Sequence, residues 1–290
     1  MASLEQLIQY LVSGATLGSV YALVAIGFTI IFSVTGIINF AQGEFVMLGG
    51  MVSYWLMNAA SLPAPLAFLG AVLATAAVGF ALDRWAIRTA RGSSVISLII
   101  ITIGASILIR GLAGQFWGKD AVPLPPFSGD TPIRLGVAVL VPQSLWVMAT
   151  MLVATLALKL VLDYTMLGKA LRACAINRRA AGLLGIDVRA MSLISFSLSG
   201  ALGALAGIVV APITLTSYDV GTMLGLKGFA AAALGGFGSQ LGAVVGGLVL
   251  GLAESLAAGL VSSAYKDAVA LLVLFLVLLV RAGGVAGEDG

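Results

Sequence analysis

Long apolar runs, separated by short polar stretches, dominate the pattern of this sequence. At about 20 apolar residues per crossing of a bilayer, they predict membrane segments near residues 7–33, 40–58, 62–82, 95–113, 143–163, 191–211, 222–238, 241–261 and 264–281. These segments fill most of the chain. The expected fold is therefore all-α: one polytopic transmembrane helical bundle of about eight or nine membrane segments, forming a single domain over 1–290.

Three of the runs do not read as simple spans. The run at 7–33 is long for one crossing and holds Gly14, Gly18 and Gly27. The run at 40–58 opens on polar residues, and the run at 222–238 is short, rich in glycine and alanine, and carries a lysine. Such segments are often broken helices, tolerated only where protein or a water-filled cavity satisfies the backbone. We therefore expect one or two broken helices that line a path through the membrane. The candidate path residues are Asn39, Gln42, Glu44, Tyr218 and Lys227.

Ionisable side chains in these runs have an alternative interpretation. A charge at the bilayer centre costs about 2.5–3.5 kcal/mol on insertion scales, so each charge could instead pair with a neighbour or extend to an interface. Pairing or extension to an interface is the favoured interpretation for Glu44, Lys227 and Glu254, most strongly for Glu254. Lys266 and Asp267 are expected to form a solvated pair at the outer end of the last helix.

Glycines recur every fourth residue in several runs, which lets helix backbones approach closely in a bilayer. Close packing within one bundle explains the pattern best, and a homodimerising face is the alternative. The predicted packing positions are Gly14, Gly18, Gly203, Gly207, Gly242, Gly246 and Gly251.

Composition strengthens the membrane assignment and narrows the chemistry. Only 27 of 290 residues are charged, less than half the share of about 25% in a soluble domain. Histidine is absent, Cys174 is the single cysteine, and no acidic cluster stands beside a metal partner. We expect no metal, no cofactor and no catalytic residue. A net charge of +3 spread over a membrane chain gives no indication of nucleic-acid binding.

Basic residues set the expected orientation. Eight of the 15 lysines and arginines lie in the loops at 83–94 and 164–190, which should face the cytoplasm. The proline-rich loop at 114–142 should lie outside. Parity then places the N-terminus outside and the C-terminus in the cytoplasm.

The loop at 164–190 is the most informative segment. Residues 169–184 favour helix, with leucines on one side and arginines on the other, and Gly182 and Gly185 suggest two short helices broken at a glycine. Either an amphipathic helix lies on the membrane surface, or the loop docks a cytoplasmic partner.

Three separated segments carry a family resemblance, and they occur in the family's order. The first is Gly168-Lys169-Ala170-Leu171-Arg172-Ala173 continuing to Ile186, the second is Gly36-Ile37-Ile38-Asn39-Phe40-Ala41-Gln42-Gly43-Glu44-Phe45, and the third runs from Phe229 to Ser239 and on to Glu254-Ser255. The chain resembles permease subunits of bacterial ATP-binding cassette (ABC) importers of the branched-chain amino acid, LivH-like type.

The resemblance implies a subunit of the bacterial inner membrane that pairs with a second, similar permease, docks two cytoplasmic ATPase subunits and receives solute from a periplasmic binding protein. The loop at 164–190 would be the coupling loop. Its coupling residues would be Arg172, Asn177, Arg178, Leu183 and Gly185. The chain itself would not be an enzyme, because hydrolysis would occur on the ATPases. Branched-chain or other amino acids are the expected solutes, with amides, urea or small organic acids left open.

An alternative class is a stand-alone ion-coupled secondary transporter or channel. Such proteins often use buried acid or histidine relays and inverted repeats. This sequence has no histidine and few acids in its apolar runs. The importer subunit is therefore the leading hypothesis.

Overall fold

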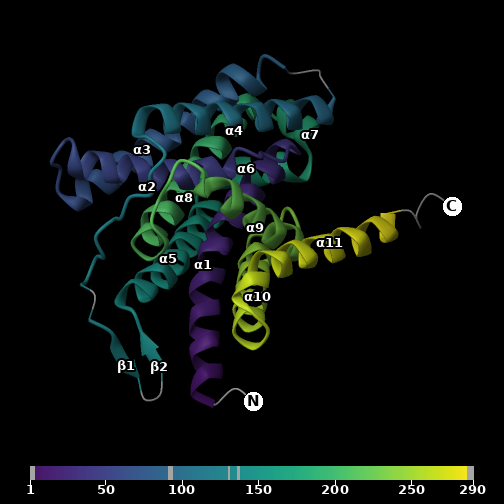
Figure 1. The fold of residues 1–290 in the computed structure, drawn as a ribbon. Helices are drawn as coiled ribbons and strands as arrows, with labels where there is room; N and C mark the ends of the chain where they lie inside the picture. Colours follow the sequence, from purple (N-terminus) through teal and green to yellow (C-terminus); the bar gives the residue numbers. More distant parts are fainter. Residues whose placement is uncertain (1–3, 91–93, 130, 136–137, 286–290) are drawn as a thin grey trace.

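The computed structural model describes residues 4–90, 94–129, 131–135 and 138–285, and the architecture is almost entirely helical (Figure 1). In chain order the helices are α1 Leu4–Thr35, α2 Gln42–Asn58, α3 Ala64–Ala81, α4 Val95–Trp117, α5 Pro142–Tyr164, α6 Met166–Ile176, α7 Arg178–Leu183, α8 Val188–Thr214, α9 Val220–Gly235, α10 Gln240–Leu260 and α11 Lys266–Val285. A π-helical turn, Leu82–Ile87, extends α3, and a 3-10 turn, Ser263–Tyr265, precedes α11. Strands β1 Ile133–Leu135 and β2 Ala138–Leu140 pair antiparallel in the loop before α5.

Six helices in the described ranges are long and apolar enough to cross a membrane: α1, α3 with its π-helical turn, α4, α5, α8 and α10. The two runs expected to be broken form shorter helices, 17 residues in α2 and 16 in α9. Helix α11 occupies the last predicted run. A helical membrane bundle is thus confirmed, while the count of eight or nine segments stays a prediction. Residues 286–290, predicted to be cytoplasmic, lie outside the described part of the chain.

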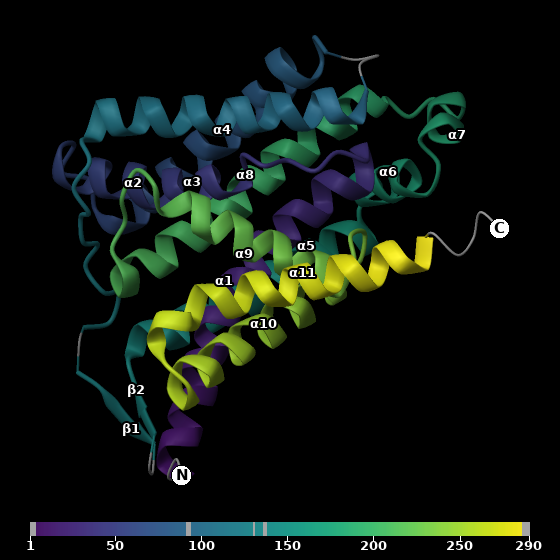
Figure 2. The same ribbon diagram turned by 45° about the vertical axis from the view of Figure 1, so that its right-hand side comes forward.

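Helices α1 and α10 lie side by side through the bundle (Figures 1 and 2). The stretch of α1 from Val20 to Ile31 is buried throughout. Helix α4 lies across the outside of the bundle, with most of its large side chains exposed. In Figure 2, α6, α7 and the described end of α11 lie toward one end of the molecule, and the segment between α4 and α5 lies toward the other.

Polar residues mark where several helices begin. The hydroxyls of Ser94 and Ser239 accept hydrogen bonds from the backbone N–H groups of Ser97 and Gly242, and the Asp187 carboxylate accepts from Arg189 and Ala190. Each side chain satisfies an N–H group that has no partner within its own helix. These caps fix the starts of α4, α10 and α8.

Glycines bring α1 and α10 into backbone contact. A Cβ atom at Gly14 would lie 2.8 Å from the Cα of Leu252, and one at Gly18 would lie 2.8 Å from the Cα of Leu248. On the facing helix, Gly251 approaches the backbone of Gly18 equally closely. Only glycine leaves room for this packing, which replaces the hydrophobic force that is missing between helices in lipid.

The other predicted glycine positions contact different helices. Gly242 and Gly246 of α10 face the backbone of α9 at Gly235 and Ala231. Gly203 and Gly207 of α8 face α2, where a Cβ at Gly203 would lie 2.6 Å from the Cβ of Phe45. Helix α10 therefore presents separate glycine rows to α1 and to α9.

Candidate functional site

Helices α2 and α9 meet at their N-terminal ends inside the bundle. A Cβ at Gly43 would lie 2.9 Å from the Cα of Gly225, and Gly43 and Gly221 approach each other's carbonyl groups closely. The free N–H groups at a helix N-terminus carry a partial positive charge. Two such ends side by side create a polar environment that favours an anionic group.

Glu44 occupies this position, in the first turn of α2, and is only 1% exposed. Its Oε1 accepts a hydrogen bond of 2.8 Å from the Ser106 hydroxyl of α4. Its Oε2 has no hydrogen-bond partner among the described residues, and a Cβ at Gly221 would lie 3.0 Å from it. The carboxylate is thus half satisfied in a buried setting, which is costly for a charged group.

A cavity of about 240 Å³ adjoins this carboxylate, between α1, α4 and α9. Ser106 and Gly221, the two neighbours of Glu44, belong to its wall. One helical turn beyond Ser106, Arg110 donates a hydrogen bond to the Thr222 hydroxyl. The remaining wall is apolar: Phe28, Phe40, Ile103, Ile107, Gly225, Leu226 and Phe229.

Gln42 and Asn39, two other predicted path residues, lie in the protein core. The Gln42 side chain bonds to Ser199 of α8, through the Ser199 carbonyl at 3.3 Å and through its hydroxyl. Asn39 Oδ1 accepts from the backbone N–H of Ala41 at 3.1 Å. Neither residue lines the cavity beside Glu44. Tyr218 packs against Gly114 of α4.

Lys227, the fifth predicted path residue, belongs to a separate buried cluster. Its Nζ lies 2.8 Å from Glu254 of α10 and 2.6 Å from Asp267 of α11. The Tyr21 hydroxyl of α1 donates to the second Glu254 oxygen at 2.8 Å, and Lys266 lies 3.5 Å from Glu254. Lys266 and Asp267 are 40% and 54% exposed, as expected, but the expected pairing with each other is wrong, because Lys266 pairs with Glu254 and Asp267 pairs with Lys227.

The loop at 164–190 folds into two short helices, α6 and α7. The break lies at Asn177 and not at a glycine, because the Asn177 side chain accepts from the N–H groups of Arg179 and Ala180 and so starts α7. Gly182 lies inside α7, and Gly185, at φ +86°, follows its end. The expected break at a glycine is therefore wrong.

The other candidate coupling residues either anchor this loop or project from it. Arg172 pairs with Asp163 at 2.8 Å, and Arg178 donates to the carbonyl of Thr35 at the end of α1 at 3.2 Å. Leu183 is 90% exposed. Two further exposed apolar side chains, Ile176 and Leu184, accompany it.

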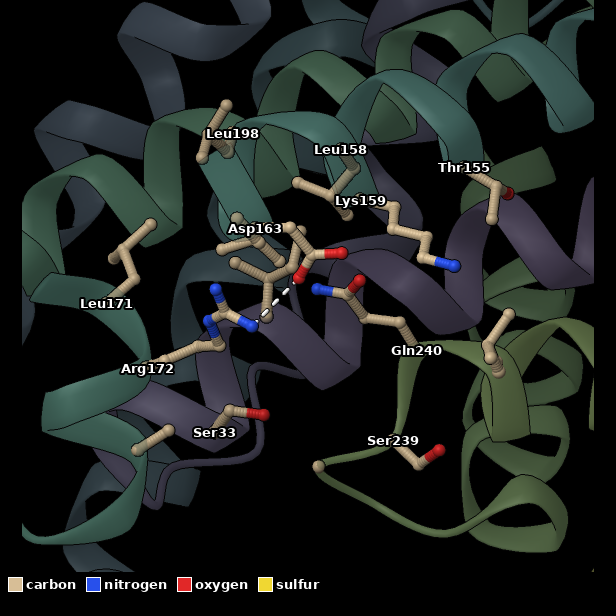
Figure 3. Close-up of a pocket in the computed structure, with 15 residues that line it drawn as sticks. Ser33, Thr155, Leu158, Lys159, Asp163, Leu171, Arg172, Leu198, Ser239 and Gln240 are labelled. Atoms are coloured by element: carbon tan, nitrogen blue, oxygen red, sulfur yellow. Dashed lines mark hydrogen bonds and ion pairs between the residues drawn. The ribbon is translucent and has the colours of Figure 1, made fainter. Parts of the chain in front are cut away.

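A second cavity, of about 390 Å³, lies beside α6 (Figure 3). Arg172 and Asp163 form their ion pair on its wall, and Lys159 and Gln240 extend toward it from α5 and from the start of α10. Residues of α6 and residues at the start of α10 both line this cavity, which therefore lies between the loop at 164–190 and α10.

Sequence reasoning missed Ser106, which bonds to Glu44, and Tyr21, which bonds to Glu254. It also missed Arg110 and Thr222, which bond to each other on the wall of the adjoining cavity. A signal was present for Arg110, which is the only charge in the apolar run at 95–113. The serine, threonine and tyrosine residues gave no such signal in the sequence, because these residue types are common in membrane helices.

These features define a polytopic helical membrane protein whose charged groups meet between helices rather than in an enzyme-like arrangement of nucleophile and base. A sequence profile of the family described as "Branched-chain amino acid transport system / permease component" matches residues 10–278. The chain belongs to this family of ABC transporter permeases.

Two amino acid permeases match over nearly their full length, and a ribose permease matches over about two thirds of its length. The high-affinity branched-chain amino acid transport system permease protein LivH of Salmonella typhimurium is 36% identical, covering 97% of this chain and 96% of the relative. The corresponding protein BraD of Pseudomonas aeruginosa is 35% identical, covering 99% and 98%. The ribose import permease protein RbsC of Escherichia coli is 30% identical, covering 75% of this chain and 66% of the relative. All three relatives are named as transport permeases.

Proposed function

We propose that this chain is the membrane-spanning permease subunit of an ATP-driven importer for branched-chain or similar amino acids. The whole chain acts as one transmembrane domain of the bacterial inner membrane, with its C-terminus in the cytoplasm. It pairs with a second, similar permease, which is a different subunit or a second copy. It binds two cytoplasmic ATPase subunits and accepts solute from a periplasmic binding protein.

The observation that carries this proposal is the surface of α6 and α7. Ile176, Leu183 and Leu184 are 88%, 90% and 82% exposed on a short capped loop. Exposed apolar side chains gathered on one surface indicate a binding partner. An ATPase with an apolar groove would cover them, in the manner of a helix docking into a groove.

The loop is also joined to the membrane helices, as a coupling element requires. Arg178 contacts the end of α1, and Arg172 contacts Asp163 near the end of α5. Movement of α6 and α7 on a closing ATPase pair would therefore reach both helices directly. The path residues Glu44 and Lys227 lie on or against α9, which packs on α1.

Co-purification with the ATPase subunits tests the docking surface. Leu183→Asp, and separately the pair Arg172→Ala and Arg178→Ala, should lose ATPase binding and uptake while the chain still inserts in the membrane. Lys119→Gln, a charge change in the segment after α4, is the matched control and should retain both. Retention of ATPase binding and uptake in the loop variants would refute the coupling role and favour a loop that lies on the lipid surface.

A second measurement separates this proposal from a stand-alone transporter. The purified chain alone in liposomes should not accumulate leucine under a proton or sodium gradient, whereas the full complex should do so with ATP. The buried Glu254 and the exposed Asp267 are both paired with Lys227, which does not favour an ion relay. Gradient-driven accumulation by the chain alone would overturn the proposal.

A further inference from the structure

The cavity between α1, α4 and α9 has the polar groups that a small zwitterion needs. Glu44 Oε2 is buried without a partner among the described residues. On α4, no carboxylate of the described chain lies within ion-pair distance of Arg110. The wall of the cavity therefore carries Arg110, which bonds to the Thr222 hydroxyl and has no carboxylate within ion-pair distance, while the Glu44 carboxylate lies directly behind that wall, bonded to Ser106.

Burial makes this arrangement informative. A buried charged group without a full set of partners is unfavourable by several kcal/mol or shifts to its neutral form, and native proteins leave few polar groups in this state. At Lys227 the same chain pairs its buried charges completely. Other buried polar atoms of the described residues also lack a partner, but Glu44 Oε2 is the one that belongs to an ionisable side chain; the others are Thr29 Oγ1, Asn39 Nδ2, Thr75 Oγ1 and Trp117 Nε1.

The apolar wall and the volume of the cavity indicate the side chain and the size of the occupant. Phe28 and Phe229 pack edge to face with ring centroids 5.8 Å apart, and Phe40 lies 5.6 Å from Phe229. Ile103 and Ile107 complete the surface from α4. The cavity holds about 240 Å³, less than the roughly 300–1,000 Å³ of pockets for drug-sized ligands, which limits the occupant to few heavy atoms.

We propose that this cavity is a transient binding site for a zwitterionic α-amino acid with an apolar side chain. The ammonium group donates to Glu44 Oε2, the carboxylate accepts from Arg110 and the Thr222 hydroxyl, and the side chain lies on the phenylalanine wall. Thr222 lies in the first turn of α9, whose positive N-terminal end also favours a carboxylate. A sugar would leave both charges unpaired.

The site rests on the proposed function, which it deepens by giving the permease its own contacts with the solute. Ser106, whose hydroxyl bonds to Glu44, and Gly221 belong to the cavity wall, whereas Glu44 itself does not. Contact between an occupant and the carboxylate therefore requires the Ser106 side chain to rotate away. Such a site would bind the solute weakly during passage, since a permease must also release it.

Cysteine protection tests occupancy directly. Ile107→Cys, in a chain with Cys174→Ala, places a thiol on the cavity wall, and Leu108→Cys is the control at the same depth of α4 but off the wall; the two native side chains are 56% and 62% exposed. In the assembled complex in liposomes, leucine should slow labelling by N-ethylmaleimide several-fold at Ile107→Cys only. Ribose and 3-methylbutylamine, which lacks the carboxylate, should not. Equal protection by either compound, or none by leucine, would overturn the assignment.

Uptake by charge-removing variants provides the second arm. Glu44→Gln and Arg110→Gln should each lower the kcat/KM of leucine uptake by about 10-fold or more, the effect of one lost charge-assisted hydrogen bond, while ATPase binding persists. Glu5→Gln, at the exposed start of α1, should leave uptake unchanged. Uptake within about 2-fold of the original in both variants would refute the site. Where a variant fails to assemble, the protection experiment on the Ile107→Cys chain decides.

The two proposals fail in different ways. Leucine protection without ATP-driven uptake would leave the site standing and refute the importer. ATP-driven uptake without leucine protection would leave the importer standing and refute the site.

Discussion

The glycine contact between α1 and α10 gives a quantitative prediction for Gly18→Ala. A Cβ at this position would lie 2.8 Å from the Cα of Leu248 and 2.9 Å from the carbonyl oxygen of Gly247. Carbon atoms pack best at about 3.5–4.0 Å, so the two helices must separate by about 1 Å. Both neighbours are backbone atoms, which leaves no side chain that could rotate away.

A matched control isolates the packing effect. Gly111 of α4 has no atom within 4 Å of an added Cβ, and both substitutions gain the same helix propensity of about 1 kcal/mol. The difference between Gly18→Ala and Gly111→Ala is therefore the overpacking cost alone, about 1–3 kcal/mol. Gly18→Ala should be less stable than the original chain or close to it, and Gly111→Ala more stable.

Unfolding of the detergent-solubilised chain, followed by circular dichroism with rising denaturant or temperature, measures this difference. Gly18→Leu should enlarge the effect and reduce the yield of folded protein. Equal stability of Gly18→Ala and Gly111→Ala would refute the reasoning, because it would mean that α1 and α10 do not pack through their glycines.

Three other expectations follow from side-chain contacts. Asn177→Ala should remove the cap of α7, at a cost of about 1 kcal/mol, and should speed amide exchange at residues 178–183 about 5-fold. Asn177→Asp should keep the cap and the slower exchange. Equal exchange in the two variants would contradict the cap. Lys227→Met or Glu254→Gln alone should each destabilise the fold by about 3–5 kcal/mol, and the double variant by less than their sum; simple additivity in unfolding measurements would contradict the ion pair. Hydrogen bonds from the backbone N–H groups of Ala190 and Arg189 lower the pKa of Asp187. The contribution of the Asp187 cap to folding stability is therefore complete above the ordinary carboxyl pKa and is lost as the pH falls through the lowered pKa. Acid titration of unfolding should therefore show a smaller loss of stability for Asp187→Asn than for the original chain, and an equal loss would contradict this cap.

The membrane bundle was predictable because its signals are local. Apolar runs of the right length predicted the long helices, and spacing of four residues marked the glycines that the structure places against neighbouring backbones. The break between α6 and α7 was misplaced because glycine and asparagine both interrupt helices. Only the Asn177 side chain, seen bonded to the following N–H groups, identifies the break.

The charged sites needed the tertiary structure, since their members are far apart in sequence. Glu44 and Ser106 are separated by 62 positions, and Tyr21 and Glu254 by 233. Sequence alone gave Glu44 and Lys227 as members of one candidate set, whereas packing assigns them to two clusters on different faces of α9. The Lys266–Asp267 expectation failed for the same reason, because the pairing groups come from α9 and α10.

Composition and periodicity by themselves determined that this chain is a helical membrane protein with basic loops, because burying a charge or an unpaired backbone group in lipid is too costly to permit other solutions. The chain order of three short motifs also pointed to its family. Only the fold decided which glycine row faces which helix, which charges neutralise each other, and which oxygen of Glu44 has no partner among the described residues. These properties depend on distances between helices, and no local pattern of residues encodes them.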